Sequence, residues 1–136
     1  MRFVRLASLT IGLGLAAVFL VLLVVNFWNA HQERCQSESM RRIRAWDDAL
    51  VLVSRNHAKP NVESPEELSR FAEFAGTSPF DGWGRRLSIR FPGGGREIRS
   101  LGSDGIPDSG DAGASKGFGA DIVLRDGNWT QFPEGW

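Results

Sequence analysis

The chain begins with an uninterrupted apolar stretch. Residues 6–28 carry no formal charge, and as a helix they would span about 34 Å, enough to cross the hydrocarbon core of a bilayer. Arg2 and Arg5 precede the stretch, which favours a cytoplasmic amino end, and Trp28 closes it as an interfacial anchor. The pattern predicts a cytoplasmic tip and transmembrane anchor over residues 1–30 and an extracytoplasmic domain over residues 31–136.

A cleaved secretory signal is the main alternative for this stretch. Its apolar run is longer than the usual signal core of about 7–15 residues. Ala30 is the nearby small residue, and Trp28 two positions earlier makes a poor match to a small-x-small cleavage site. An uncleaved anchor is therefore favoured.

Helical spacing continues past the predicted membrane span. One apolar stripe recurs at steps of three and four residues and predicts an amphipathic helix; its members are Met40, Ile43, Trp46, Leu50 and Val53. Pro60 biases Lys59 away from helical conformation, so the helix should end near Asn56. A second, short helix is predicted to begin at Ser64, with Glu67 completing a capping box, and to end at Gly76.

Beyond Gly76 the apolar period changes to two. Leu87, Ile89 and Phe91 alternate with polar residues, and residues 97–101 alternate again after a Pro-Gly turn, which predicts an antiparallel hairpin. Residues 122–124 and 129–132 predict two further strands, joined by a tight Asp-Gly turn. The predicted fold class is α+β: a long amino-terminal transmembrane and amphipathic helix packed on a small antiparallel sheet.

An acidic loop separates the hairpin from the third predicted strand. Residues 104–121 hold four Asp, five Gly and one Lys, a composition that cannot bury an apolar core. A hard divalent cation with oxygen ligands would relieve the repulsion between the carboxylates, and calcium is the simplest candidate. The alternative is a flexible surface loop, because Gly, Asp and Ser are ordinary turn residues.

Charge and cysteine content exclude several classes of function. The 16 basic and 16 acidic residues balance, so nucleic-acid binding is a poor fit. Cys35 is the single cysteine, which leaves no intrachain disulfide and no multi-cysteine metal site. It could link two copies of the chain, but an idle thiol is the favoured interpretation. His31 and His57 lie far apart in sequence and support neither a zinc site nor a catalytic one.

Two phrases around the predicted hairpin resemble the major pseudopilin of type II secretion systems. Asp81-Gly82-Trp83-Gly84 is similar to the Asp-Pro-Trp-Gly that precedes that family's first strand. The phrase of residues 100–105, Ser-Leu-Gly-Ser-Asp-Gly, is similar to its Ser-Leu-Gly-Ala-Asp-Gly, and Asp121-Ile122 to its closing Asp-Ile. The resemblance covers residues 78–125, and the helical part matches in architecture.

The resemblance implies a pseudopilin-like domain with a calcium site in its carboxyl-terminal loop. In that family, Asp side chains and a backbone carbonyl hold the ion. The matching positions here are Asp104, Asp121 and the carbonyl of Leu101. Asp108 and Asp111 have no firm counterpart in the family, because this loop is longer than the family's usual one. They are candidate ligands on their chemistry alone.

The amino-terminal end departs from the family pattern. Pseudopilins carry a processing signal with Gly before Phe-Thr and a Glu five residues into the mature helix. Residues 5–12 offer no such phrase, and the first acidic residue is Glu33. The departure argues against an ordinary fibre subunit and favours an anchored relative that keeps the globular domain.

These observations predict a non-enzymatic, single-pass protein of the bacterial inner membrane, with its domain in the periplasm. The expected role is structural, in or beside a type II secretion or pilus machine. Its expected partners are the membrane, components of that machine or other envelope proteins, and a second copy of the chain. An anchored protein-binding module unrelated to secretion is the main alternative. An enzyme using the loop carboxylates is a third hypothesis, weakened by the lack of an evident nucleophile or paired histidine.

Overall fold

The computed structural model describes residues 2–56, 65–109, 113–115 and 117–134. The chain divides into two compact units, Met1–Gln32 and Glu33–Trp136. The boundary that the sequence predicted lies after residue 30.

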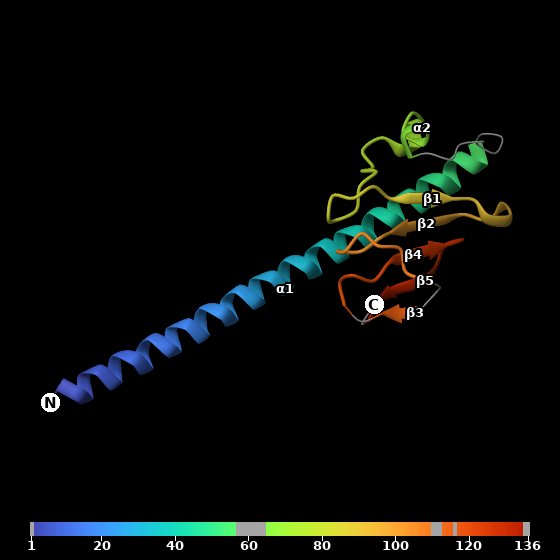
Figure 1. Ribbon diagram of the computed structural model, residues 1–136. Helices are drawn as coiled ribbons and strands as arrows, with labels where there is room; N and C mark the ends of the chain where they lie inside the picture. The colour runs from blue at the N-terminus through green and yellow to red at the C-terminus, as the bar shows by residue number, and fades with distance from the viewer. Residues whose placement is uncertain (1, 57–64, 110–112, 116, 135–136) are drawn as a thin grey trace. The chain divides into compact units, whose positions relative to one another are not determined.

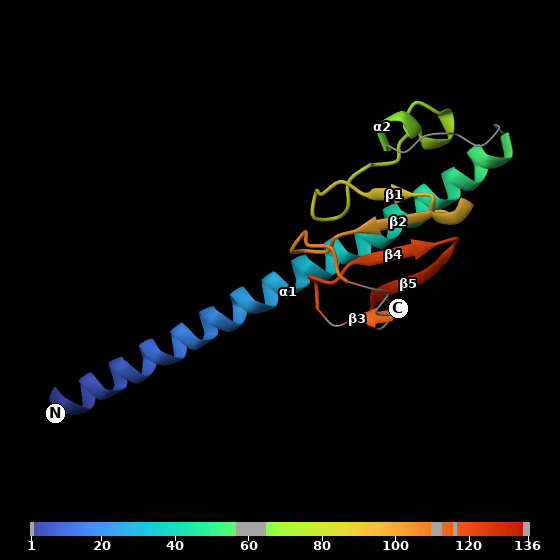
Figure 2. The same ribbon diagram turned by 45° about the vertical axis from the view of Figure 1, so that its right-hand side comes forward.

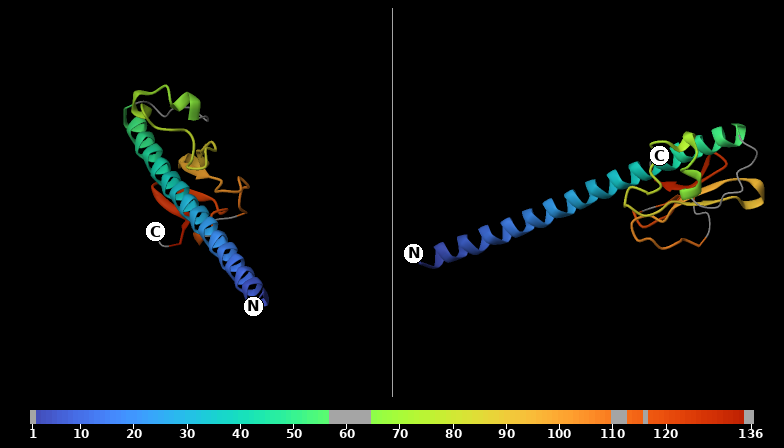
Figure 3. Two further views of the ribbon diagram at one scale, coloured as in Figure 1. Left: turned by 90° about the vertical axis from the view of Figure 1, so that its left-hand side faces the viewer. Right: turned by 90° about the horizontal axis from the view of Figure 1, so that it is seen from above.

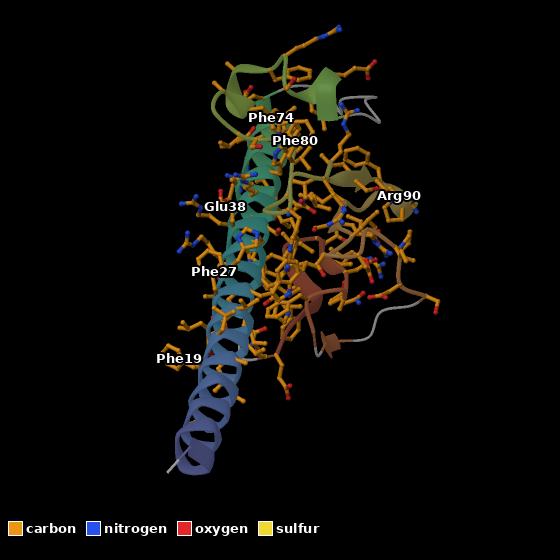
Figure 4. All side chains as sticks on the ribbon, turned by 60° about the vertical axis from the view of Figure 1, so that its left-hand side comes forward. Phe19, Phe27, Glu38, Phe74, Phe80 and Arg90 are labelled. Carbon is orange, nitrogen blue, oxygen red and sulfur yellow. The ribbon has the colours of Figure 1, made fainter. Side chains whose placement is uncertain are left out.

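Helix α1 covers Arg2–Asn56 and ends where the sequence predicted. Its large apolar residues between Leu15 and Trp28 are exposed; Phe19 and Phe27 project from the helix (Figure 4). Counted from Gly14, this described helix is long and apolar enough to cross a membrane. A contiguous apolar surface of this kind needs a membrane or a partner to cover it.

Within the second unit, the later part of α1 lies along one face of a sheet (Figure 2). The predicted stripe is confirmed, because its five members are all buried in the core. They pack with residues from the sheet and from the segment that follows α1; these are Leu68, Phe74, Leu87, Ile89, Ile98, Ile122 and Leu124.

The sheet contains five strands in the order β1-β2-β4-β5-β3 (Figure 1). Strands β1 (Ser88–Arg90), β2 (Glu97–Ser100), β4 (Ile122–Arg125) and β5 (Asn128–Pro133) pair antiparallel. These four strands confirm the predicted α+β class. The turn between β4 and β5 has positive φ at Asp126 and Gly127, as the Asp-Gly pair predicted.

The sequence did not predict β3. This strand, Gly113–Ser115, arises within the acidic loop and pairs parallel with β5, so it forms one edge of the sheet. Its Gly-Ala-Ser sequence has neither the apolar alternation nor the β-branched residues that mark a strand.

Two local expectations were wrong. In place of one helix extending to Gly76, the chain forms α2 (Pro65–Leu68) and a separate 3₁₀ turn, Ala72–Phe74. Phe91 does not continue the buried face of β1, because the chain leaves the strand at Arg90 and turns, leaving Phe91 exposed.

Candidate functional site: the acidic loop and its two anchoring phrases

The sheet has a second face, away from α1. Residues paired across the strands point to the same face. One such row consists of Arg99 on β2, Val123 on β4 and Gln131 on β5, and it alternates with the core row that contains Ile98 and Leu124. The chain that follows β2 runs on this side of the sheet (Figure 3, right).

The two phrases that carry the family resemblance contact each other through Asp81, whose side chain is fully buried. Asp81 Oδ1 accepts the backbone N–H groups of Trp83, at 3.0 Å, and Arg85, at 2.8 Å. This is the local turn that Asp side chains favour. Asp81 Oδ2 accepts the hydroxyl of Ser100 at 2.7 Å. One carboxylate therefore fixes the first turn and connects it to the end of β2.

Helix α1 holds the same turn from the other side. Arg42 donates to the carbonyls of Phe80 and Asp81, both at 2.9 Å, and Ser39 Oγ accepts the N–H of Gly82 at 2.8 Å. A Cβ on Gly82 would lie 1.9 Å from the carbonyl oxygen of Cys35. Gly82 is thus required for this close approach to the helix backbone. Cys35 is itself buried, and burial raises the pKa of its thiol.

The predicted ligands at the start of the loop are engaged in backbone turns. The carbonyl of Leu101 accepts the N–H of Gly105 at 3.1 Å. Asp104 is exposed, and its Oδ1 accepts the N–H of Ile106 at 2.9 Å. Both residues are among those that the resemblance assigns to a metal ion, and each accepts one backbone N–H here.

Asp108 and Asp121 come together at the end of the loop. The N–H of Asp108 donates to Asp121 Oδ2 at 3.1 Å, and the N–H of Asp121 donates to Asp108 Oδ2 at 2.9 Å. Gln131 Nε2 also donates to Asp108 Oδ2, at 2.7 Å. Arg99 Nη1 lies 3.0 Å from Asp121 Oδ2. The pair thus closes the loop onto the row of the sheet that contains Arg99 and Gln131.

Asp121 is fully buried, and that burial raises its pKa. The hydrogen bond from the Asp108 backbone and the charge of Arg99 both act to lower the pKa, but burial is the larger effect. Among the described residues, three buried side-chain atoms of this network have no hydrogen-bond partner: Arg99 Nε, Asp121 Oδ1 and Gln131 Oε1.

Each described member of the predicted calcium site takes part in a hydrogen bond within the fold. Leu101, Asp104, Asp108 and Asp121 make the contacts above, and Asp121 Oδ1 has no hydrogen-bond partner. Asp111 lies outside the described residues. Within the described ranges no group of three or more His, Cys, Asp or Glu residues could hold a metal ion. The unpartnered atoms of the Asp121 network are two acceptors and one donor, and a cation binding the acceptors would have a guanidinium as its neighbour.

Asp81 and Ser100 lie in the two resembling phrases, but the sequence predicted no role for either residue. It also gave no reason to single out Gln131. The signal for Asp81 was local, because an Asp before Gly-Trp-Gly is placed to accept N–H groups two and four residues later. Gln131 carried no such signal.

Known proteins do not decide the family: no family model, no curated protein and no solved structure matches this chain. The resemblance to pseudopilins therefore rests on the two phrases and the order of the elements alone.

Proposed function

We propose that this chain is a membrane-anchored, pseudopilin-like protein with a structural or assembly role in or beside a type II secretion or pilus machine. The observation that carries the proposal is the contact of the two resembling phrases, in which Asp81 of the first accepts the hydroxyl of Ser100 at the start of the second. Along the chain, the two phrases flank the hairpin and follow the apolar helix. This is the order in which the family arranges these parts.

The proposed anchor is the apolar part of α1, with the amino end in the cytoplasm and the domain on the other side of a bacterial inner membrane. The exposed apolar residues between Leu15 and Trp28 support a membrane environment for it. Arg2 and Arg5 support the orientation.

A structural role accords better with the carboxylates than an enzymatic one. Asp81 and Asp121 are fully buried, and both accept backbone N–H groups that hold turns and loop in place. A catalytic carboxylate needs an oxygen within hydrogen-bond reach of a substrate. These carboxylates are used to hold the fold.

Proximity labelling in native cells tests the proposal. A labelling enzyme fused after residue 136 is expected to modify components of a secretion or pilus machine beyond the background of a control fusion that carries residues 1–30 alone. Recovery of other envelope proteins without such components would contradict the secretion role and favour an anchored binding module of a different system.

A further inference from the structure

Arg85 reaches from the first phrase to the backbone of the second. Its Nη1 donates to the carbonyl of Gly102 at 2.7 Å, and its Nη2 donates to the carbonyl of Ser103 at 2.6 Å. A Cβ on Gly105 would lie 2.7 Å from Arg85 Nε, so Gly105 leaves the room that this side chain occupies. The Arg85 guanidinium therefore bridges two successive carbonyls directly before the acidic loop of residues 104–121.

Arg99 acts at the other end of the same loop. Its Nη1 lies 3.0 Å from Asp121 Oδ2, and the exposed fractions of the two side chains are 17% and 0%. The same oxygen of Asp121 accepts the N–H of Asp108. A single cation thus sits at the point where the loop closes on itself.

The oxygens that these two arginines contact are of the kind that calcium selects. Calcium takes carboxylate and backbone carbonyl oxygens, and a guanidinium fork offers several donors to the same types of acceptor. The charge of Arg99 next to Asp121 also offsets repulsion from the neighbouring Asp108, an effect that the sequence had suggested for a metal ion.

We infer that Arg85 and Arg99 hold the acidic loop closed from its two ends in place of a metal ion, so that ordering of the loop does not require calcium. This inference concerns the loop alone and does not depend on the proposed secretion role.

Amide hydrogen exchange in the full-length chain, held in detergent micelles, tests the inference. The informative amides belong to Ser103, Gly105, Asp108 and Asp121, all of which donate hydrogen bonds that exist when the loop is closed. Peptides that contain them are expected to exchange at the same rate with millimolar calcium and with a chelator. Protection that rises tenfold or more with calcium would overturn the inference.

Substitutions in the same protein identify the arginines responsible. Arg85→Gln and Arg99→Gln are each expected to speed exchange of loop amides at least tenfold, with calcium present or absent. Arg90→Gln is the matched control, because Arg90 is exposed on β1 of the same sheet (Figure 4). The loop amides of Arg90→Gln are expected to exchange at the rate seen in the unaltered chain. Loop exchange in both test variants equal to that of the control would overturn the inference.

Two further measurements separate loop opening from loss of the fold. Peptides from residues 40–53 of α1 report the core and should keep their protection in Arg85→Gln. Arg85→Lys keeps the charge but loses the planar fork, so we expect loop exchange between that of the unaltered chain and that of Arg85→Gln. If a variant fails to fold, the comparison of calcium with chelator on the unaltered chain still decides.

Discussion

Replacing Trp46 by alanine is expected to lower the free energy of unfolding by about 3–5 kcal/mol, the range for truncating a buried aromatic residue. Trp46 is fully buried. Its ring centroid lies 4.5 Å from that of Phe74, and its Nε1–H donates to the carbonyl of Ser78 at 2.8 Å. Truncation therefore opens a cavity in the core next to Phe74 and also leaves the Ser78 carbonyl without its donor.

Denaturant unfolding of the full chain in detergent, followed by circular dichroism, measures this effect. Leu52→Ala is the matched control on the same helix, because the Leu52 side chain is 47% exposed. It should change the free energy of unfolding by about 0.5 kcal/mol or less. A loss below about 1 kcal/mol for Trp46→Ala would contradict the described core.

Asp81→Ala is expected to have the second large effect, a loss of at least about 3 kcal/mol. The side chain is fully buried and accepts hydrogen bonds from Trp83, Arg85 and Ser100. Hydrogen bonds to a charged group contribute about 1.5–3 kcal/mol each, and donors left without an acceptor add a desolvation cost. The turn and the end of β2 should separate together.

The same unfolding measurement tests whether Asp81 connects the turn to the end of β2 or is only a buried polar side chain with no such role. Ser100→Ala removes one of the three hydrogen bonds and should cost about a third as much as Asp81→Ala. Asp81→Asn keeps one acceptor oxygen for the two backbone N–H groups and should fall between these variants. Equal losses for Ser100→Ala and Asp81→Ala would show that Asp81 does not hold the turn.

The sequence predicted the helix and the four antiparallel strands because periodicity decides them. The stripe from Met40 to Val53 has a helical period and is buried along its length, and the segment around Ile98 has a strand period. The exposed apolar stretch before Trp28 could also be predicted, because its length and hydropathy are local properties of the chain.

Gln131 shows why the site was harder to predict. Strict alternation would put Gln131 on the same face as Trp129. A β-bulge shifts the register, so that Trp129 pairs with Leu124 in the core row and Gln131 pairs with Val123 in the row on the other face. No residue type in the segment Asn128–Pro133 marks this extra residue, so the side chain that holds Asp108 could not be found from the pattern.

The arginine contacts were hidden for a different reason. Arg85 and Arg99 lie in residues 84–99, which hold five Arg and one Glu, a composition typical of a solvated surface. The loop that they contact follows later in the chain. Only the fold brings Arg85 to the carbonyls of Gly102 and Ser103. Composition showed that the acidic loop needs positive charge but not which group supplies it.

Alkaline extraction of cell membranes, combined with the intact mass of the chain, tests the central claim of a single-pass anchored protein most directly. Helix α1 is continuous from Arg2 to Asn56, and its large apolar residues between Leu15 and Trp28 are exposed. The protein is expected to stay in the membrane pellet at alkaline pH and to retain its amino-terminal residues through Trp28. A soluble species whose amino terminus is His31 would contradict it.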